Sequence, residues 1–179
     1  MQVLIDHEAM KRNNQLRILN TIREKGAMSR IALQKETKLG WGTITSSVKE
    51  LLEKQVLVET GSVDTNLGRK PVNIDLNETR NFTLGLRLGT NQVKTALLNV
   101  KGKRILSHAV DINPDSTKAK ILEWIYRVIN ETLEMAVIEQ DLVAGVGIAA
   151  PGAVDNTTGT CLYAPRHPNW KNVHLREKV

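Results

Sequence analysis

Residues 29–61, SRIALQKETKLGWGTITSSVKELLEKQVLVETG, decide the fold of the first part of this chain. The stretch reads as a short helix, a turn ending at Gly40, a second helix over residues 42–54 and then a strand. Ser29 is a good N-cap for the first of these helices, because its hydroxyl can accept a hydrogen bond from a free backbone N–H. Helical spacing places the inward stripe of the second helix at Ile44, Val48, Leu51 and Leu52.

The sequence on either side completes a winged helix-turn-helix. Apolar residues at helical spacing predict a preceding helix over residues 8–25, which Gly26 ends. The strand at residues 56–58 is followed by a loop rich in Gly, Asn, Asp and Ser, and alternating apolar and polar residues predict a returning strand over 71–76. Three helices and a two-stranded hairpin therefore predict a winged helix-turn-helix domain of α+β type over residues 1–76.

The second helix begins with small hydroxylated residues, although a buried helix would be expected to begin with leucines. In helix-turn-helix proteins the N-terminal residues of this helix contact base edges in the major groove. Hydroxyl groups can bond bases or phosphates, and a threonine methyl group can contact a thymine methyl group. We therefore predict DNA-binding residues at Ser29, Arg30, Trp41, Gly42, Thr43, Thr45, Ser46, Ser47 and Lys49, and at Arg69 and Lys70 in the wing. Two structural alternatives to DNA contact remain. The Ser and Thr residues could serve only to cap an exposed helix start, and the wing could be an ordinary hairpin turn.

The positive charge of the chain is concentrated in the helix-turn-helix region. The formal net charge is +6. Residues 9–49 carry nine Lys and Arg against two Glu, whereas residues 50–80 carry four Lys and Arg against six Asp and Glu. A local basic excess is expected of a protein that binds the phosphate backbone of DNA, although a solvated basic helix face would give the same tally.

The composition favours a globular protein of the cytoplasm. Apolar residues make up 41% of the chain, and no apolar run approaches the length of a transmembrane helix. The polar start MQVLIDHEAMKRN does not resemble a signal peptide. Cys161 is the only cysteine, so the chain cannot form an intrachain disulfide or a cysteine-built metal site. We therefore expect a cytoplasmic protein with no membrane partner.

The spacing of apolar residues changes in the second half, where it predicts an α/β domain over residues 82–179. Three strand candidates, FTLGLRL, VKTALLNV and RILSHAVDI, follow a polar linker, NETRN, at residues 77–81. A long helix is expected from Pro114 to about Gln140, and the apolar run LVAGVGIAA is typical of a strand buried on both faces. A last helix is expected from about Asn172, and with no later strand we expect the domain to be incomplete.

Two segments of this domain resemble the ROK family, which groups repressors and sugar kinases. They are GLRLGTN at residues 85–91 and GVGIAAPGAVD at residues 145–155, with Gly159 and the segment RHPNW after them. The N-terminal winged helix, with MKRNNQLRILNTIREKGAMSR at its start, resembles the repressor branch, xylose-repressor-like proteins especially. The resemblance covers almost the whole chain. It implies an actin-like (RNase H-like) ATPase fold for the second domain, cut off after its first lobe.

The sequence departs from the kinases of this family at the phosphate motif. The resemblance implies D-x-G-G-T after the first strand, and here Arg87, Thr90 and Asn91 stand at the Asp, second Gly and Thr positions. The change to arginine reverses the local charge, which is incompatible with the family's handling of a metal ion and phosphate there. The family's catalytic aspartate and its His/Cys zinc cluster would lie beyond Val179. We therefore expect no enzyme activity and no cofactor in this chain, and a structural zinc only in a longer protein.

The resemblance also implies a sugar-binding site. In the family this site is built partly from the PG-x-VD turn and the Pro-x-W segment, which places sugar-binding residues at Gly152, Ala153 and Arg166. Many members carry Asn where this chain has Arg166. Because an arginine can bind a carboxylate or a phosphate through two hydrogen bonds, an acidic or phosphorylated sugar is one candidate ligand. We interpret Trp170 as a core residue and His167 as a histidine of a surface loop.

Together these features predict a sequence-specific transcriptional repressor of sugar-utilisation genes. Its partners would be operator DNA, a sugar or sugar derivative as effector, and a second copy of the chain, because one recognition helix reads too few base pairs. Two alternatives remain open. One is a ROK-type sugar kinase with an accessory N-terminal domain, and the other is a DNA-binding protein whose second domain only dimerises.

Overall fold

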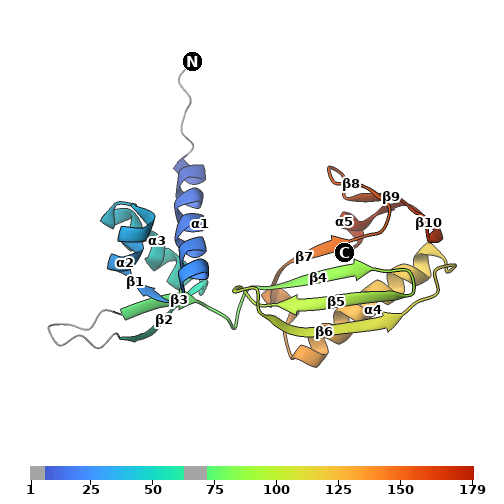
Figure 1. Cartoon of the computed structure of the whole chain (residues 1–179), viewed down its shortest axis with the longest axis horizontal. Coiled ribbons are helices and arrows are strands. Elements are labelled where there is room, and N and C mark those ends of the chain that lie inside the picture. Colours follow the sequence, from blue (N-terminus) through green and yellow to red (C-terminus); the bar gives the residue numbers. More distant parts are fainter. Residues whose placement is uncertain (1–6, 63–71) are drawn as a thin grey trace, which may run out of the picture. The chain divides into compact units, whose positions relative to one another are not determined.

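The computed structural model describes residues 7–62 and 72–179 of the chain. These residues belong to two compact units, Met1–Arg80 and Asn81–Val179 (Figure 1). The division between the units lies within the segment 77–81.

The first unit has the winged helix-turn-helix arrangement that the sequence predicts. Three helices precede a β-hairpin, and a two-residue strand that the sequence does not reveal joins the hairpin to give a three-stranded sheet in the order β1-β3-β2. The elements are α1 (His7–Lys25), β1 (Met28–Ser29), α2 (Arg30–Thr37), α3 (Trp41–Glu53), β2 (Leu57–Ser62) and β3 (Val72–Leu76).

Local sequence determines where α2 and α3 begin and end. Ser29 caps α2 as predicted, because its hydroxyl accepts a hydrogen bond from the Ala32 N–H at 3.2 Å. Lys38 ends α2 in the left-handed conformation, with φ of 55°, and its N–H donates to the Gln34 carbonyl. Helix α3 follows directly after Gly40.

Apolar side chains from all three helices and the hairpin form the core of the first unit. Leu52, the fourth member of the predicted inward stripe, is only half-buried, because it lies about 100° round the helix from Leu51. The buried apolar residues are Ile18, Ile22, Leu33, Ile44, Val48, Leu51, Leu57, Ile74 and Leu76.

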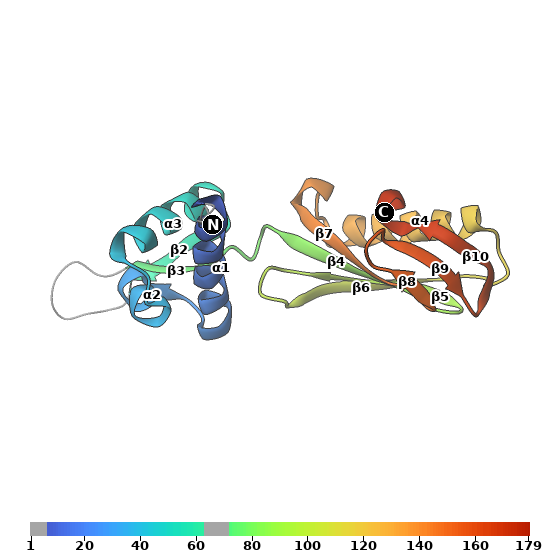
Figure 2. The same cartoon turned by 90° about the horizontal axis from the view of Figure 1, so that it is seen from above.

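The second unit has the predicted α/β arrangement. Four strands form a sheet in the order β6-β5-β4-β7, in which β4 and β7 are parallel and the other neighbours are antiparallel. Helix α4 lies along one face of this sheet, against β5 and β6 (Figure 2). The elements are β4 (Phe82–Leu88), β5 (Gln92–Leu98), β6 (Arg104–Asp111), α4 (Lys118–Ala136) and β7 (Val143–Ala149).

A second sheet, which the sequence analysis did not predict, follows β7. Its three strands are antiparallel in the order β10-β9-β8. Two of them have only three and five residues, and the third, HPNWKNVH, is polar and contains a β-bulge, so none shows the apolar alternation by which a strand is recognised. The elements are β8 (Ala153–Asp155), β9 (Thr160–Ala164), β10 (His167–His174) and α5 (Leu175–Lys178), with a 3-10 turn, η1 (Gln140–Leu142), before β7.

Three boundaries of the last two helices differ from the prediction. Helix α4 ends at Ala136 rather than at about Gln140, because Val137 adopts the left-handed conformation with φ of 54°. Helix α4 begins at Lys118 rather than at Pro114, because the hydroxyl of Thr117 caps its first turn. The last helix begins at Leu175, since Asn172, where its start was expected, lies within β10.

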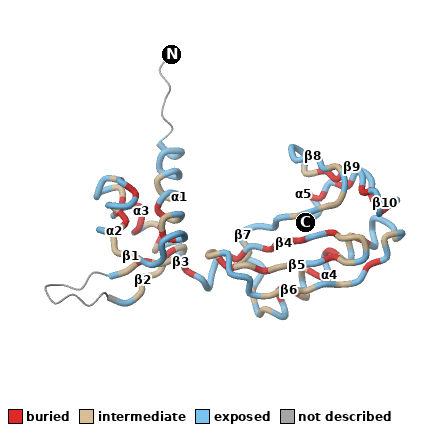
Figure 3. The backbone as a smooth tube through the Cα atoms, in the orientation of Figure 1, coloured by how far each residue is buried: buried red, intermediate tan, exposed pale blue. Residues whose placement is uncertain are grey.

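Strand β7 is not buried on both faces, and this prediction was wrong. Residues 144–147 are exposed, as Figure 3 shows along the strand. In the described sheet β7 is an edge strand paired with β4 alone, and α4 covers β5 and β6 instead. An apolar run indicates that a strand can be buried, but it does not say which elements cover it.

Candidate functional site

The N-terminal turn of α3 is the centre of the predicted DNA-binding surface. Thr43 is half-buried, and Ile44 beside it is completely buried. A Cβ added at Gly42 would meet no atom within 4 Å, so the backbone is open there to close approach. Because the first turn of a helix has backbone N–H groups without helical partners, hydroxyls and free N–H groups lie together at this place. The exposed predicted contacts here are Trp41, Gly42, Thr45 and Ser46.

Ser47 is an exception to the predicted surface. It is only 4% exposed. Residues three apart share a face of a helix, so Ser47 lies on the same side as Ile44 and packs inward with it. Ser47 is therefore not available to DNA. Lys49 is exposed, with its Nζ 3.9 Å from Glu53 Oε1.

Ser29 and Arg30 both have structural partners. Ser29 is half-buried and serves as the cap of α2. Arg30 Nη2 lies 3.1 Å from Glu59 Oε1 on β2, and this ion pair joins the start of α2 to the hairpin. A contact between Arg30 and DNA would compete with that ion pair.

Other cations lie close to the start of α3. The wing residues Arg69 and Lys70 are outside the described residues, so their role stays a prediction. Lys35 on α2 and Lys38 in the turn before α3 are exposed and form no ion pair within the described part of the chain. Both belong to the basic excess of residues 9–49, but neither is among the DNA contacts predicted from the sequence. Their place at the end of α2 and in the turn before α3 is the signal that could have found them.

The start of α1 borders the same surface. A hollow of about 650 Å³ lies between α1 and α3, and Lys11 and Asn14 of α1 line it together with Thr43 and Ser46 of α3. None of the DNA contacts predicted from the sequence lies on α1. A cationic and an amide side chain therefore lie beside the hydroxyls predicted to contact DNA.

Glu50 of α3 holds these two helices together. Its carboxylate accepts hydrogen bonds from Lys11 Nζ at 2.6 Å and Gln15 Nε2 at 3.0 Å on α1, and from Lys54 Nζ at 2.8 Å. The bonds from Lys11 and Lys54 lower the pKa of Glu50 to about 2. The ionised carboxylate thus fixes the position of α1 against α3.

In the second unit, Gly152 and Ala153 lie beside the turn that carries Arg166. Gly152 has φ of +88°, and a Cβ placed on it would lie 2.0 Å from the Tyr163 carbonyl oxygen and 3.0 Å from Pro165 Cδ. The glycine is therefore required by its own backbone conformation and by the close approach of β9. The structure brings the three predicted sugar-binding residues to one end of the small sheet, and their contact with a ligand stays a prediction.

Arg166 lies on a two-residue turn between β9 and β10. Pro165 and Arg166 connect Ala164 to His167, which are paired across the two strands. Proline presets its own φ for such a turn. The Arg166 side chain is exposed and has no hydrogen-bond partner among the described residues. It is free to bind an anionic ligand.

His167 is not a surface-loop histidine, contrary to the prediction. It is completely buried, and its Nε2–H donates to the carbonyl oxygen of Gly89 at 2.9 Å, in the turn between β4 and β5. Its Nδ1 has no partner within the described residues. The prediction for Trp170 is confirmed, because this side chain is also completely buried. The two side chains anchor the Arg166 turn to the rest of the unit.

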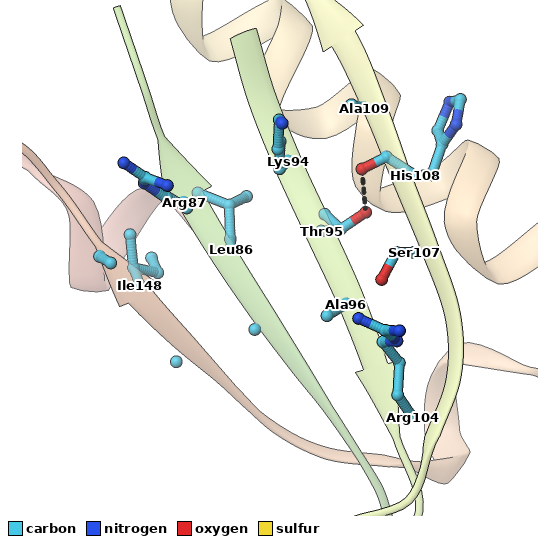
Figure 4. A pocket seen from close by; sticks show the side chains of 13 residues that line it. Leu86, Arg87, Lys94, Thr95, Ala96, Arg104, Ser107, His108, Ala109 and Ile148 are labelled. Carbon is cyan, nitrogen blue, oxygen red and sulfur yellow. Dashed lines mark hydrogen bonds between the residues drawn. The ribbon is translucent and has the colours of Figure 1, made fainter.

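The sheet face opposite α4 carries Arg87 and Lys94, which are directly paired across β4 and β5 and are both exposed. Small residues surround them, and together they line a hollow of about 890 Å³. Figure 4 shows Arg104 toward the other end of this hollow. The small lining residues are Gly85, Ala96, Ser107, Ala109, Gly147 and Ala149.

Two models of known protein families match this chain. Residues 11–58 match the model of winged helix-turn-helix DNA-binding domains. Residues 83–179, more than half of the chain, match the model of the ROK family. The chain belongs to the ROK family. The resemblance stated from the sequence, with its winged helix and its sugar-kinase-like domain, is confirmed.

Two curated ROK relatives are named xylose repressors. The chain is 29% identical over 174 residues to the xylose repressor of Caldicellulosiruptor bescii and 25% identical over 179 residues to that of Bacillus subtilis. The alignments cover 97% and 98% of this chain but 43% and 45% of the relatives. The chain therefore spans less than half the length of these relatives.

A solved ROK structure has the same fold. It is the crystal structure of a ROK family transcriptional regulator, a homologue of the E. coli MLC protein, with a TM-score of 0.73 and 28% sequence identity. The match covers 94% of this chain and 42% of that one. Within the described residues of this ROK chain, no helix is long and apolar enough to cross a membrane, and no group of three or more His, Cys, Asp and Glu side chains is placed to hold a metal ion.

Proposed function

We propose that this chain is the DNA-binding and effector-sensing part of a sequence-specific transcriptional repressor of sugar-utilisation genes. One observation carries the proposal: Thr45 and Ser46 are exposed at the start of α3, while Ile44 and Val48 of the same helix are completely buried. The helix can therefore present hydroxyls to DNA while its other face holds the unit together. This surface shares a chain with a ROK domain whose relatives are named repressors.

DNA would be bound through the start of α3 in the major groove. Lys35 and Lys38, which have no ion pair within the described residues, would contact backbone phosphates beside it. One such helix reads few base pairs, so we propose a dimer whose two helices occupy half-sites about 34 Å apart. A repressor that binds operator DNA in this way would act in the cytoplasm.

The effector would be a sugar or sugar derivative bound near Gly152, Ala153 and Arg166. Support comes from their meeting at one end of the small sheet and from the exposed side chain of Arg166. Xylose is the first sugar to test, because two relatives are named xylose repressors. Effector and operator would affect each other's affinity equally, since the coupling of two binding sites is reciprocal.

Fluorescence anisotropy of labelled upstream DNA tests both halves of this proposal. The intact protein is expected to bind its own upstream region more tightly than a scrambled duplex, and at least one sugar is expected to change that affinity. Equal affinity for both duplexes would overturn the DNA-reading half. An unchanged affinity with every sugar would overturn the sensing half.

Two rival functions predict different results. A sugar kinase is disfavoured because Arg87 reverses the charge at the phosphate motif. ATP-dependent phosphorylation of a sugar by the intact protein would support the kinase function instead. A DNA-binding protein whose ROK domain only dimerises would bind DNA with steep salt dependence but would gain no thermal stability from any sugar.

A further inference from the structure

The inward face of α1 ends in a polar side chain that has no partner. Ile22 and Ile18 are completely buried, and Asn14 follows them at the same spacing of four residues toward the start of the helix. Asn14 is half-buried, and its side-chain amide makes no hydrogen bond within the part of the chain that the structure describes. An amide placed in this way can bind a group from outside the chain, and its surroundings indicate which group.

Asn14 lines the hollow of about 650 Å³ between α1 and α3, two helices that pack against each other (Figure 1). Lys11 lies one turn earlier on the same face of α1, and Thr43 and Ser46 line the hollow from α3. Gly42 also lines it, and no atom lies within 4 Å of a Cβ added there. The hollow therefore opens beside the hydroxyls that are predicted to contact DNA.

We infer that this hollow binds one phosphate group of the operator backbone through the Asn14 amide and the Lys11 ammonium, an inference that rests on the proposed DNA binding by α3. A recessed hollow accepts a group that projects from the duplex. The phosphates project in this way, whereas base edges lie inside the grooves. Phosphate contacts fix the register and orientation of a protein on DNA, so α1 would help to place α3 in the groove.

The charge of the hollow favours a phosphate, although Glu50 also lines it. The Glu50 carboxylate accepts hydrogen bonds from Lys11 Nζ at 2.6 Å and from Lys54 Nζ at 2.8 Å, and Gln15 Nε2 donates a third at 3.0 Å. Two cations against one carboxylate leave a net positive charge. An ammonium has three N–H donors, so Lys11 can bond to Glu50 and still donate to a phosphate oxygen. Glu50 is thus a positioning residue that holds the ammonium at the hollow.

Asn14 differs in kind from the exposed lysines Lys35 and Lys38 near the same surface. Those side chains have no ion pair within the described residues, so they can attract phosphates from several directions. A short, half-buried amide between two packed helices can bond to a phosphate at one place only. Asn14 is therefore expected to set where α3 enters the groove as well as to add affinity.

Fluorescence anisotropy of the intact protein with its labelled upstream DNA tests the contact. Asn14→Ala is expected to weaken binding about tenfold, the effect of losing a hydrogen bond to a charged group. It should leave the salt dependence of binding unchanged, because no charge is removed. Lys11→Gln should also weaken binding, and it should reduce the slope of log K against log salt concentration by about one.

The neighbouring residues Asn13 and Arg12 supply matched controls. Both are exposed on α1, and neither lines the hollow. Asn13→Ala and Arg12→Gln are therefore each expected to change the affinity by no more than about twofold. Equal weakening by Arg12→Gln and Lys11→Gln would mean general charge attraction and would overturn the inference. Equal affinities of Asn14→Ala and the unaltered protein would overturn it too.

Duplexes in which single phosphates are replaced by uncharged methylphosphonates identify the group that Asn14 contacts. One replacement in each half-site should weaken binding by the unaltered protein and should weaken binding by Asn14→Ala no further, because the two changes remove the same contact. If Asn14→Ala instead relaxes the preference for one base pair, and every replacement keeps its full effect in that variant, Asn14 reads a base and the inference is wrong.

Thermal unfolding checks that the variants fold. Alanine is a better helix former than asparagine, and Asn14 makes no hydrogen bond within the described residues, so Asn14→Ala should not lower Tm. A lower Tm would assign Asn14 to the fold and would overturn the inference. If the unaltered protein prefers its upstream DNA to a scrambled duplex and Asn14→Ala binds that DNA equally well, the repressor function stands and the α1 contact is wrong. Equal affinity of the unaltered protein for both duplexes would overturn the DNA-reading function itself, and the α1 contact with it.

Discussion

The Nε2 of His167 and the carbonyl oxygen of Gly89 lie 2.9 Å apart and join two turns that are 78 positions apart in the sequence. One turn follows β4 and the other carries Arg166. The imidazole is completely buried, so this hydrogen bond is shielded from water and fixes where the Arg166 turn lies.

His167→Ala is therefore expected to destabilise the second unit. The change removes the donor to Gly89 and leaves a cavity, and we expect the free energy of unfolding to fall by about 2–4 kcal/mol. Urea unfolding followed by tryptophan fluorescence measures this, since Trp170 is buried in the same segment. Arg166→Ala is the control, because the exposed neighbour should change stability by no more than about 0.5 kcal/mol. Equal losses in both variants would contradict a specific role for the buried histidine.

The sequence predicts those parts of the structure in which periodicity is strong. The stripe of Ile44, Val48 and Leu51 in α3 repeats at helical spacing, and the burial of these side chains follows from it. Ser47 was missed because residue type suggested a surface contact, whereas its position three residues after Ile44 turns it inward. Position round the helix was the better guide.

Long-range contacts explain most of what could not be predicted. The burial of His167 depends on Gly89, and no local pattern links the two residues. Strand β8 has only three residues, and a β-bulge between His167 and Lys171 interrupts the pairing of β9 with β10, so local alternation does not reveal these strands. Exposure of β7 follows from its place at the edge of the described sheet, which composition does not encode.

Substitutions of the neighbouring residues Ser46 and Ser47 at the start of α3 are expected to affect operator binding differently. Ser46→Ala and Thr45→Ala should each weaken operator binding by about fivefold, the effect of losing one hydrogen bond of about 1 kcal/mol. Ser47→Ala should leave operator affinity unchanged, because Ser47 lies about 100° round the helix from Ser46 and is only 4% exposed. Anisotropy titrations at one salt concentration measure all three. A larger loss for Ser47→Ala than for Ser46→Ala, with the fold intact by circular dichroism, would rule out this orientation of the helix on DNA.

Glu50→Gln should remove a pH dependence from the stability of the first unit. Hydrogen bonds from Lys11 and Lys54 hold the pKa of Glu50 at about 2 in the folded protein, below its ordinary value of 4.5. The stabilising contribution of the carboxylate is therefore fully present above pH 4.5 and is lost as the pH falls toward 2. Because both lysines are more than half exposed, salt should reduce the effect.

Urea unfolding between pH 2 and 6, followed by the helical circular dichroism signal, measures the Glu50 effect. Between those limits Glu50→Gln should show a flatter dependence of stability on pH than the unaltered protein. Glu53→Gln is the control, since the contact of Glu53 with Lys49 is 3.9 Å long and exposed. Identical slopes for the unaltered protein and Glu50→Gln would show that the contacts of Glu50 with the two lysines do not persist in solution.

Gly152→Ala tests whether this glycine is needed for stability as well as for ligand binding. Its φ is +88° and the new methyl group would lie 2.0 Å from the Tyr163 carbonyl oxygen, so backbone would have to move. We expect a loss of about 3 kcal/mol or more in unfolding free energy. Gly102→Ala is the matched control: its φ is +78°, but no atom lies within 4 Å of the added Cβ, so only the strain of about 1 kcal/mol remains.

A thermal unfolding series of the two glycine variants, with and without sugar, decides how Gly152 acts. If Gly152→Ala lowers Tm well below that of Gly102→Ala before any sugar is added, a lost sugar response in that variant reflects displacement of the turn between β7 and β8 from β9. If instead the two variants unfold at the same temperature and only Gly152→Ala loses the sugar response, the close approach of β9 tolerates the methyl group. Gly152 would then act on the ligand directly, as the family resemblance implies.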